Sequence, residues 1–198
     1  MRDTQPADRE KILPYCRVPI VVREADASAP EVAGRVAGLI ATKRPGALAE
    51  HIGSSAVPGL AGKGIVDLLL PTPPEEVPAV TDDLLELGFQ RQAVATAFPP
   101  TRPMLQGIIR HGDTSFRVHI HVVPASSPEV AALRGFRDAL LADPALRDEY
   151  ARLKRAIVAS GTVDSVAFSK AKHAWIVAAL ERLGLVEAAE EVKHGGLP

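Results

Sequence analysis

Residues 51–70, HIGSSAVPGLAGKGIVDLLL, constrain the fold more than any other part of the chain. Residues 53–64 hold four glycines and one proline, a composition typical of a loop. Residues 65–70 then form an apolar run of strand length, interrupted only by Asp67. Such a run is typical of a strand that is buried on both faces of a sheet. The chain is therefore expected to contain a β-sheet with one charged side chain inside a central strand.

Further strands are predicted on both sides of this stretch. β-branched residues predict a strand at 19–24, and further short strands are expected at 47–52 and 89–94. Residues 104–110 and 115–123 flank the sequence His-Gly-Asp-Thr, which predicts a hairpin turn between two strands.

Helices are predicted between these strands and after them. Apolar residues recur at helical spacing in segments 27–43 and 75–87. Beyond residue 126 the strand signals end, and three helices are expected at 128–142, 144–159 and 163–183. Mixed strands and helices followed by helices alone predict the α+β class, with a mixed β-sheet, flanking helices and a C-terminal helical segment.

The length of 198 residues fits one domain with a sizeable core. We expect a single domain over 1–198, with an α/β core at 15–125, C-terminal helices at 126–190 and a flexible arm at 1–14.

Net charge, hydropathy and cysteine content indicate the compartment of the protein and the kind of partner it binds. The net charge of −1 gives no indication of a nucleic-acid partner. No apolar run approaches the roughly 20 residues that cross a bilayer, and the polar N-terminus lacks a signal-peptide core. The single cysteine, Cys16, fits a reducing compartment. We therefore expect a cytoplasmic protein without a membrane partner, whose ligand is a small molecule.

The glycine-rich loop has the chemistry of a phosphate site. Gly53 and Ser54 can present backbone N–H groups and a hydroxyl to an anion, and Lys63 can add a positive charge. Asp67, on the following strand, would then face the ligand or a divalent cation such as Mg²⁺. The alternative is that the glycines only form turns and that Asp67 caps a loop or pairs with a basic residue.

Two histidines alternate on the strand at 115–123. His119 and His121 point to one face, where they can share a ligand, a metal ion or an anion, and Arg117 is expected on the opposite face. A polar, half-buried strand face is the alternative, since no cysteine or other third ligand stands nearby in the sequence. If this strand neighbours the strand of Asp67, the two histidines would join Asp67 and His51 in one cleft suited to acid–base chemistry.

The stretch at 51–70 closely resembles the signature of the GrpB family, which is of the UPF0157 type. Ser55 replaces the usual threonine and Gly64 a frequent proline. The matching positions are His51, Ile52, Gly53, Ser54, Val57, Pro58, Gly59, Leu60, Ala61, Lys63, Ile65 and Asp67. The resemblance continues through residues 116–123, 135–154 and 168–176.

The resemblance implies a divergent nucleotidyltransferase-like fold. Proteins of that superfamily carry a Gly-Ser pair followed, after about a dozen residues, by two metal-binding aspartates one residue apart. Here Asp67 occupies the first position and Leu69, which is apolar, the second. The resemblance therefore implies the fold more strongly than the activity, since one metal-binding carboxylate is replaced.

Two functions follow from this resemblance. The first is a Mg²⁺-dependent nucleotidyl or phosphoryl transferase acting on a small molecule, with Asp67 holding the metal and Asp67, His119 and His121 as catalytic residues. The second is a non-catalytic nucleotide- or anion-binding accessory module, because GrpB-like domains occur fused to dephospho-CoA kinase, where an accessory or folding role is inferred. A homodimer or a partner enzyme would fit the second. A metallohydrolase that uses the histidines is a weaker third reading.

The remaining candidate ligand-binding residues lie in the segments that match the family. The set expected to bind the ligand or its phosphate is His51, Gly53, Ser54, Ser55, Lys63, Arg137, Tyr150, Lys154 and Lys172. For the four helical members the alternative is a solvated amphipathic face whose lysines extend to water.

Overall fold

A computed structural model of the chain describes residues 12–93, 98–162, 164–185, 187 and 189. The helices are α1 (Ala29–Lys43), α2 (Val77–Glu86), α3 (Pro128–Ala142), α4 (Pro144–Ala159) and α5 (Ser165–Arg182). The strands are β1 (Glu50–Ile52), β2 (Ile65–Thr72), β3 (Gln90–Arg91), β4 (Met104–His111) and β5 (Thr114–Pro124), and short 3₁₀ turns occur at η1 (Ser54–Ala56) and η2 (Pro74–Glu76).

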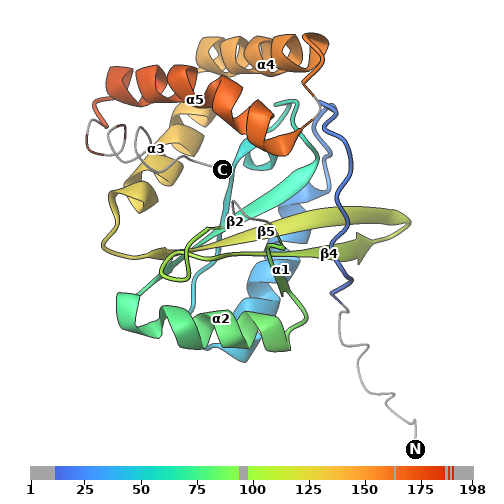
Figure 1. Cartoon of the computed structure of the whole chain (residues 1–198), viewed down its shortest axis with the longest axis vertical. Coiled ribbons are helices and arrows are strands. Elements are labelled where there is room, and N and C mark those ends of the chain that lie inside the picture. The colour runs from blue at the N-terminus through green and yellow to red at the C-terminus, as the bar shows by residue number, and fades with distance from the viewer. Residues whose placement is uncertain (1–11, 94–97, 163, 186, 188, 190–198) are drawn as a thin grey trace, which may run out of the picture.

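The five strands form one mixed sheet in the order β1-β2-β5-β4-β3. The central pair, β2 and β5, is parallel, whereas the other pairs are antiparallel. Helices α1 and α2 lie on one side of the sheet, and α3, α4 and α5 lie on the other (Figure 1). The predicted α+β class, with a mixed sheet, flanking helices and a C-terminal helical segment, is confirmed.

The two faces of the sheet differ in chemistry. Val66, Leu68, Val118 and Ile120 point to the face covered by α1 and α2, where they belong to the largest apolar core. The opposite face carries a smaller apolar cluster that includes Leu69 and residues of α3. Because side chains alternate along a strand, the polar residues of β2 and β5 share this second face with Leu69.

The predicted helices match the structure closely, because their boundaries carry strong local signals. Asp143 accepts hydrogen bonds from the N–H groups of Ala145 and Leu146 at the start of α4, and Asp164 caps α5 in the same way. Capping side chains of this kind fix a helix start whatever the tertiary surroundings are. The predicted hairpin is also confirmed, as β4 and β5.

Three predicted strands are wrong or shortened. The strand predicted at 47–52 is shortened to β1 (Glu50–Ile52). Residues 19–24 contribute only an isolated bridge between Arg23 and Gly62, since a β-branched run becomes a strand only where a sheet edge is available to it. The strand predicted at 89–94 is limited to Gln90–Arg91, and residue 94 lies outside the described residues.

The predicted arm at 1–14 lies mostly outside the described residues, but its last part packs on the sheet. Leu13 pairs with Ile108 of β4 through two backbone hydrogen bonds, and Ile12 is buried. No described helix combines the length and the apolar character needed to cross a membrane.

Candidate functional site

Two neighbouring strands carry the polar centre of the site. The parallel register of β2 and β5 places Asp67 directly beside His119, and His121 points to the same face two residues later. Asp67 Oδ1 lies 3.4 Å from His119 Nδ1 and 3.5 Å from His121 Nε2. We call these three residues the Asp–His–His cluster. The prediction that the strand of Asp67 lies next to the strand of His119 and His121 is confirmed.

The two histidines have different surroundings. His119 is partly exposed, and its Nε2 atom lies 2.9 Å from the hydroxyl of Tyr15. The His121 side chain is fully buried, and within the described part of the chain neither of its ring nitrogens has a hydrogen-bond partner. Burial lowers the pKa of His121 to about 4, so its imidazole is neutral at pH 7.

The carboxylate of Asp67 is held close to the glycine-rich loop. Burial by itself raises the pKa of Asp67, but the adjacent imidazoles of His119 and His121 outweigh it and hold that pKa well below its usual range. Gly53 has a φ of 71°, and a Cβ atom at Gly53 would lie 2.9 Å from Asp67 Oδ2. The loop therefore needs glycine at this position for two reasons, backbone conformation and the approach of Asp67.

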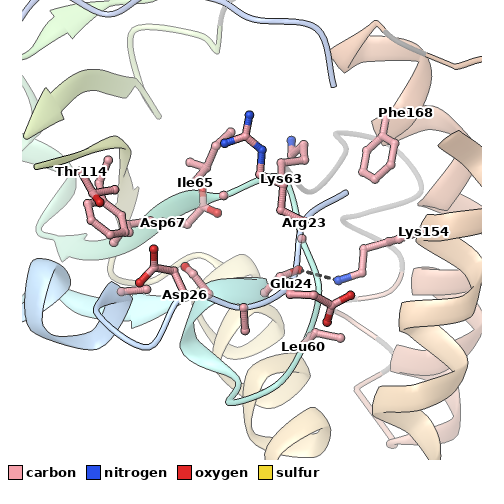
Figure 2. Close-up of a pocket in the computed structure, with 18 of the residues that line it drawn as sticks. Arg23, Glu24, Asp26, Leu60, Lys63, Ile65, Asp67, Thr114, Lys154 and Phe168 are labelled. Atoms are coloured by element: carbon pink, nitrogen blue, oxygen red, sulfur yellow. Dashed lines mark hydrogen bonds between the residues drawn. The ribbon is translucent and has the colours of Figure 1, made fainter. Parts of the chain in front are cut away.

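Three lysines surround the space beside this cluster. Lys154 Nζ donates to Ser54 Oγ at 3.0 Å and to the carbonyl oxygen of Ala61. The amines of Lys63 and Lys172 lie 5.7 Å and 5.1 Å from the centre of the Phe168 ring. We call the three lysines the lysine pocket; Figure 2 shows Lys154 reaching in from the helical layer.

The lysine pocket and the Asp–His–His cluster share a cavity system. One cavity has a volume of about 140 Å³ and a second about 80 Å³, and both are lined by Ser54, Lys63, Asp67 and Lys172. The second is also lined by His119 and Tyr150. Residues of the loop, of β2 and of the helical layer therefore converge on one space.

Burial disfavours the charged form of the three lysines, so a bound anion would stabilise the lysine pocket. Lys154 and Lys172 are 1% and 5% exposed. Burial, followed by repulsion from neighbouring cations, lowers the pKa of Lys63 to about 8 and that of Lys154 to about 7. Burial also lowers the pKa of Lys172 to about 8, although Asp67 opposes the change. A bound anion would offset these costs.

Other predicted ligand residues lie in different surroundings. His51 points to the α1 side of the sheet, because its register partner is Leu68, and its Nε2 atom lies 2.9 Å from Ser55 Oγ. The prediction that His51 shares a cleft with Asp67 is therefore wrong: neighbouring residues of a strand point to opposite faces, and Ile52 is the one paired with Asp67. Ser55 lines the larger cavity.

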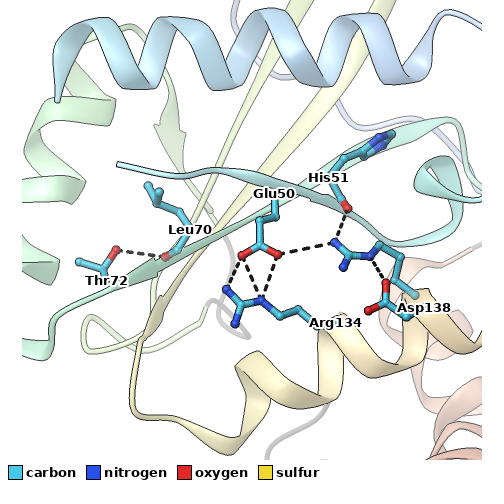
Figure 3. Close-up of polar contacts among 7 residues, drawn as sticks. Glu50, His51, Leu70, Thr72, Arg134 and Asp138 are labelled. Atoms are coloured by element: carbon cyan, nitrogen blue, oxygen red, sulfur yellow. Dashed lines mark hydrogen bonds and ion pairs between the residues drawn. The ribbon is translucent and has the colours of Figure 1, made fainter. Parts of the chain in front are cut away.

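Arg137 is occupied by other partners. Its guanidinium donates to the carbonyl oxygen of His51 at 3.2 Å and to Asp138 at 2.8 Å, and it lies 3.6 Å from Glu50 (Figure 3). It joins α3 to the edge strand β1, and it is absent from the linings of the two cavities.

Tyr150 contributes mainly through its ring. It stacks on Trp175 with ring centres 4.9 Å apart, and Lys154 Nζ lies 4.4 Å from the centre of the Tyr150 ring. Its hydroxyl pKa is raised by burial. Tyr150 therefore forms an aromatic wall against which the Lys154 amine is held.

Sequence reasoning missed Tyr15 and Phe168, and it misplaced Arg117. Arg117 lies on the same face as His119, since the two are two residues apart, and both line a third cavity of about 310 Å³. Tyr15 follows directly after the expected arm, and no local pattern ties it to a histidine 104 residues away. Phe168 lies in a segment that matches the family, but only the fold shows that two lysines flank its ring.

The donor set does not fit the Mg²⁺ expected from the sequence. Mg²⁺ prefers oxygen ligands, whereas the cluster offers one carboxylate and two imidazoles. Leu69, at the position of the second aspartate of nucleotidyltransferases, is buried in the apolar cluster with Ile52 and Val123. The described residues therefore provide a single oxygen ligand at this centre.

Several known proteins are similar to this chain in sequence. A family model described as GrpB protein matches residues 19–182. UPF0157 proteins of Pseudomonas aeruginosa and Streptomyces coelicolor are each 33% identical to the chain, over 70% and 68% of its length. These matches cover 56% of the Pseudomonas protein and 68% of the Streptomyces protein, so the chain spans about half the length of the former.

A solved structure of a GrpB protein has the same fold. The crystal structure of conserved protein GrpB from Enterococcus faecalis aligns with a TM-score of 0.64 and 22% identity, over 88% of this chain and 100% of that one. A structure of the Cid1 poly(U) polymerase aligns with a TM-score of 0.38 and 15% identity, over 68% of this chain and 44% of that one. The second likeness is too weak to carry an argument. With most of its length matched by the family model, the chain belongs to the GrpB protein family.

Proposed function

We propose that the chain binds a small phosphate-bearing molecule in the lysine pocket, with a nucleotide as the reference ligand. The observation that carries this proposal is the convergence of Lys63, Lys154 and Lys172 on one cavity system. Within the described residues, none of these amines forms an ion pair with a carboxylate at 4 Å or less. Asp67 is the one acidic residue that lines the smaller cavity. In the larger cavity, cationic side chains outnumber the three acidic residues, which are Glu24, Asp26 and Asp67. A polyphosphate supplies the negative charge that this arrangement lacks.

Neutral donors support the same ligand class. The Ser54 hydroxyl is held by Lys154, and Gly53 leaves the backbone uncovered by a side chain. A loop of this kind can bring N–H groups close to phosphate oxygens. The choice of a nucleotide as reference rests on the Gly-Ser loop and the downstream aspartate, which resemble those of nucleotidyltransferases.

Transfer of a phosphoryl or nucleotidyl group is the second candidate, and one observation favours it. His119 is 13% exposed, lines the cavity and contacts both Asp67 and the Tyr15 hydroxyl. A histidine in this position can move a proton to or from a bound hydroxyl. The single carboxylate opposes a two-metal mechanism of the usual kind.

Calorimetric titration of the full chain tests the proposal. ATP, CTP, GTP, UTP and inorganic pyrophosphate would each be titrated in EDTA and again with Mg²⁺. We expect binding to release an enthalpy that depends on the buffer, because a phosphate raises the lowered lysine pKa values and draws protons from solution.

Lys172→Met and Lys170→Met provide a matched pair on α5, since Lys172 is buried and Lys170 exposed. Losing a charge-assisted hydrogen bond worth about 1.5–3 kcal/mol lowers affinity about 10- to 100-fold in the first variant, and the second should bind normally. Equal affinities in the two variants, or no binding of any of the five compounds, would overturn the proposal. If the bound nucleotide is converted to a product over hours, the protein is a transferase or hydrolase. If the nucleotide binds and stays unchanged, the protein is an accessory module.

A further inference from the structure

We propose that Asp67, His119 and His121 bind one divalent first-row transition-metal ion of the zinc class, in place of the Mg²⁺ that the resemblance to nucleotidyltransferases implies. Two imidazoles and one carboxylate are a common ligand set for such ions, and three protein ligands leave coordination positions open for water or substrate. The site is distinct in chemistry from the lysine pocket, which takes an anion.

The spacing of the donor atoms fits a metal better than hydrogen bonds. The Asp67 Oδ1 atom lies 3.4 Å from His119 Nδ1 and 3.5 Å from His121 Nε2. Hydrogen bonds to a carboxylate are shorter, at about 2.7–3.2 Å. A tetrahedral ion with bonds of about 2.0–2.1 Å holds neighbouring ligand atoms about 3.3 Å apart. The three donor atoms all lie within 4.8 Å of one another.

The outer contacts of the histidines support the same assignment. A metal-binding histidine usually gives its second ring nitrogen to a hydrogen-bond partner, which fixes the ring. His119 directs Nδ1 to the cluster and has Nε2 at 2.9 Å from the Tyr15 hydroxyl. Tyr15 is therefore a positioning residue for His119.

His121 provides the second, independent observation. Its side chain is 0% exposed, and within the described residues neither ring nitrogen has a hydrogen-bond partner. A buried imidazole without a hydrogen-bond partner lowers the stability of the fold. The Nε2 atom of His121 points to the Asp67 carboxylate. A metal ion between the two groups would satisfy both.

Access to the centre is from the cavity system. Asp67 and His119 line the smaller cavity, together with Ile52 and Leu133 of the apolar cluster that contains Leu69. The open coordination positions of the ion therefore face the cavity. This inference goes beyond phosphate binding and does not depend on it.

The test uses the metal alone. The full chain would be stripped with EDTA, freed of the chelator, and titrated separately with Zn²⁺ and Co²⁺. We expect one ion per chain, a visible cobalt absorption of a site with nitrogen and oxygen ligands, and no displacement of Zn²⁺ by a large excess of Mg²⁺. Displacement by equimolar Mg²⁺ would overturn the inference.

Variants locate the bound ion. Removing the hydrogen-bond partner of a metal-binding histidine lowers metal affinity about 10- to 100-fold, so Tyr15→Phe should lower zinc affinity about 10-fold. His119→Gln or Asp67→Ala removes a ligand and should lower it at least about 100-fold. The matched control is His111→Gln, because His111 lies at the far end of the same hairpin and contacts Arg35 instead. It should bind like the parent chain.

Two results would contradict the assignment even if a buried variant fails to fold. The first is a thiolate-to-cobalt charge-transfer band that disappears in Cys16→Ser, which would place the ion on the exposed cysteine. The second is unchanged zinc affinity in Tyr15→Phe together with Asp67→Ala, each checked for folding by thermal melting.

Discussion

The close approach of the Asp67 side chain to the loop depends on the absence of a side chain at Gly53. Gly53 adopts a φ of 71° and a ψ of −168°, a combination that is nearly restricted to glycine. Its missing Cβ leaves room for the carboxylate, which would otherwise be 2.9 Å away. One glycine therefore allows the loop to turn and lets it approach the Asp67 carboxylate.

A comparison of two glycines separates these effects. Gly59 lies in the same loop with a φ of 74°, but a Cβ there meets nothing within 4 Å. We expect Gly53→Ala and Gly59→Ala each to lower the free energy of unfolding by about 1–3 kcal/mol, as measured by urea denaturation. Only Gly53→Ala should also lose zinc and nucleotide affinity. Full affinity in Gly53→Ala would show that the position of Asp67 is unimportant for binding.

Lys172 makes stability depend on pH. Its pKa is about 8 in the folded chain against 10.5 when unfolded, so between these values the unfolded chain holds the extra proton. The free energy of unfolding therefore rises with pH from about 8 to about 10, by up to about 3 kcal/mol for this group. Below pH 7 both states are protonated and the penalty of the buried charge is fully present.

Denaturant unfolding at several pH values checks this dependence. Lys172→Met should reduce the rise, whereas Lys170→Met should reproduce the parent curve. The rise that remains in Lys172→Met comes from Lys63 and Lys154, whose pKa values are also lowered. A parent curve that falls with pH over this range, or identical slopes for the two variants, would contradict the predicted burial of the Lys172 charge.

At the scale of elements, the edge strand β1 is fastened to α3 by arginines. Arg134 forms a bidentate pair with Glu50, and Arg137 bonds the His51 carbonyl (Figure 3). These groups are partly exposed, so such pairs contribute about 1 kcal/mol or less. The arrangement assigns Arg137 to the support of the sheet edge.

Arg137→Ala tests this placement. We expect nucleotide affinity in calorimetry to change less than about twofold and the free energy of unfolding to fall by about 1 kcal/mol or less. Lys154→Met, measured alongside, should lose at least about tenfold in affinity because its amine touches the loop. A tenfold loss in Arg137→Ala would return this residue to the ligand-binding set.

On the scale of the whole molecule, the site lies between the sheet and the helical layer. Asp67 and His119 come from β2 and β5, Ser54 from η1, and Lys154 and Lys172 from α4 and α5. A ligand that contacts all of them binds only when both layers are in place. Ligand binding and the docking of the two layers are therefore coupled.

Thermal unfolding with the tightest ligand checks this coupling. At 100 times its Kd a ligand adds about 2.7 kcal/mol, which corresponds to about 5–10 °C in Tm for a chain of this size. Amide exchange should slow in α4 and α5 as well as in β2. Protection confined to the glycine-rich loop would contradict a site shared by the two layers.

Much of the fold was predictable because its signals are local. Helices α3, α4 and α5 begin at Pro or Ser residues after capping side chains, and β2 is a bounded apolar run. The strand prediction at 19–24 was wrong because a segment forms a strand only next to a free sheet edge, and the local sequence does not show where such an edge lies. Ser54, Lys63 and Asp67 were identified from the chemistry of the glycine-rich loop, and Lys154 and Lys172 through the resemblance to the GrpB family.

The groups of the site can be found in the amino-acid sequence: a glycine-serine loop, one aspartate in an apolar strand, two alternating histidines and several lysines. How these groups combine follows from the tertiary structure. It placed Asp67 beside His119 through the parallel register of β2 and β5, brought Tyr15 to His119, and turned His51 to the other face. Distances between residues far apart in the chain depend on strand order and layer packing, and these follow from the whole set of apolar contacts rather than from any local pattern.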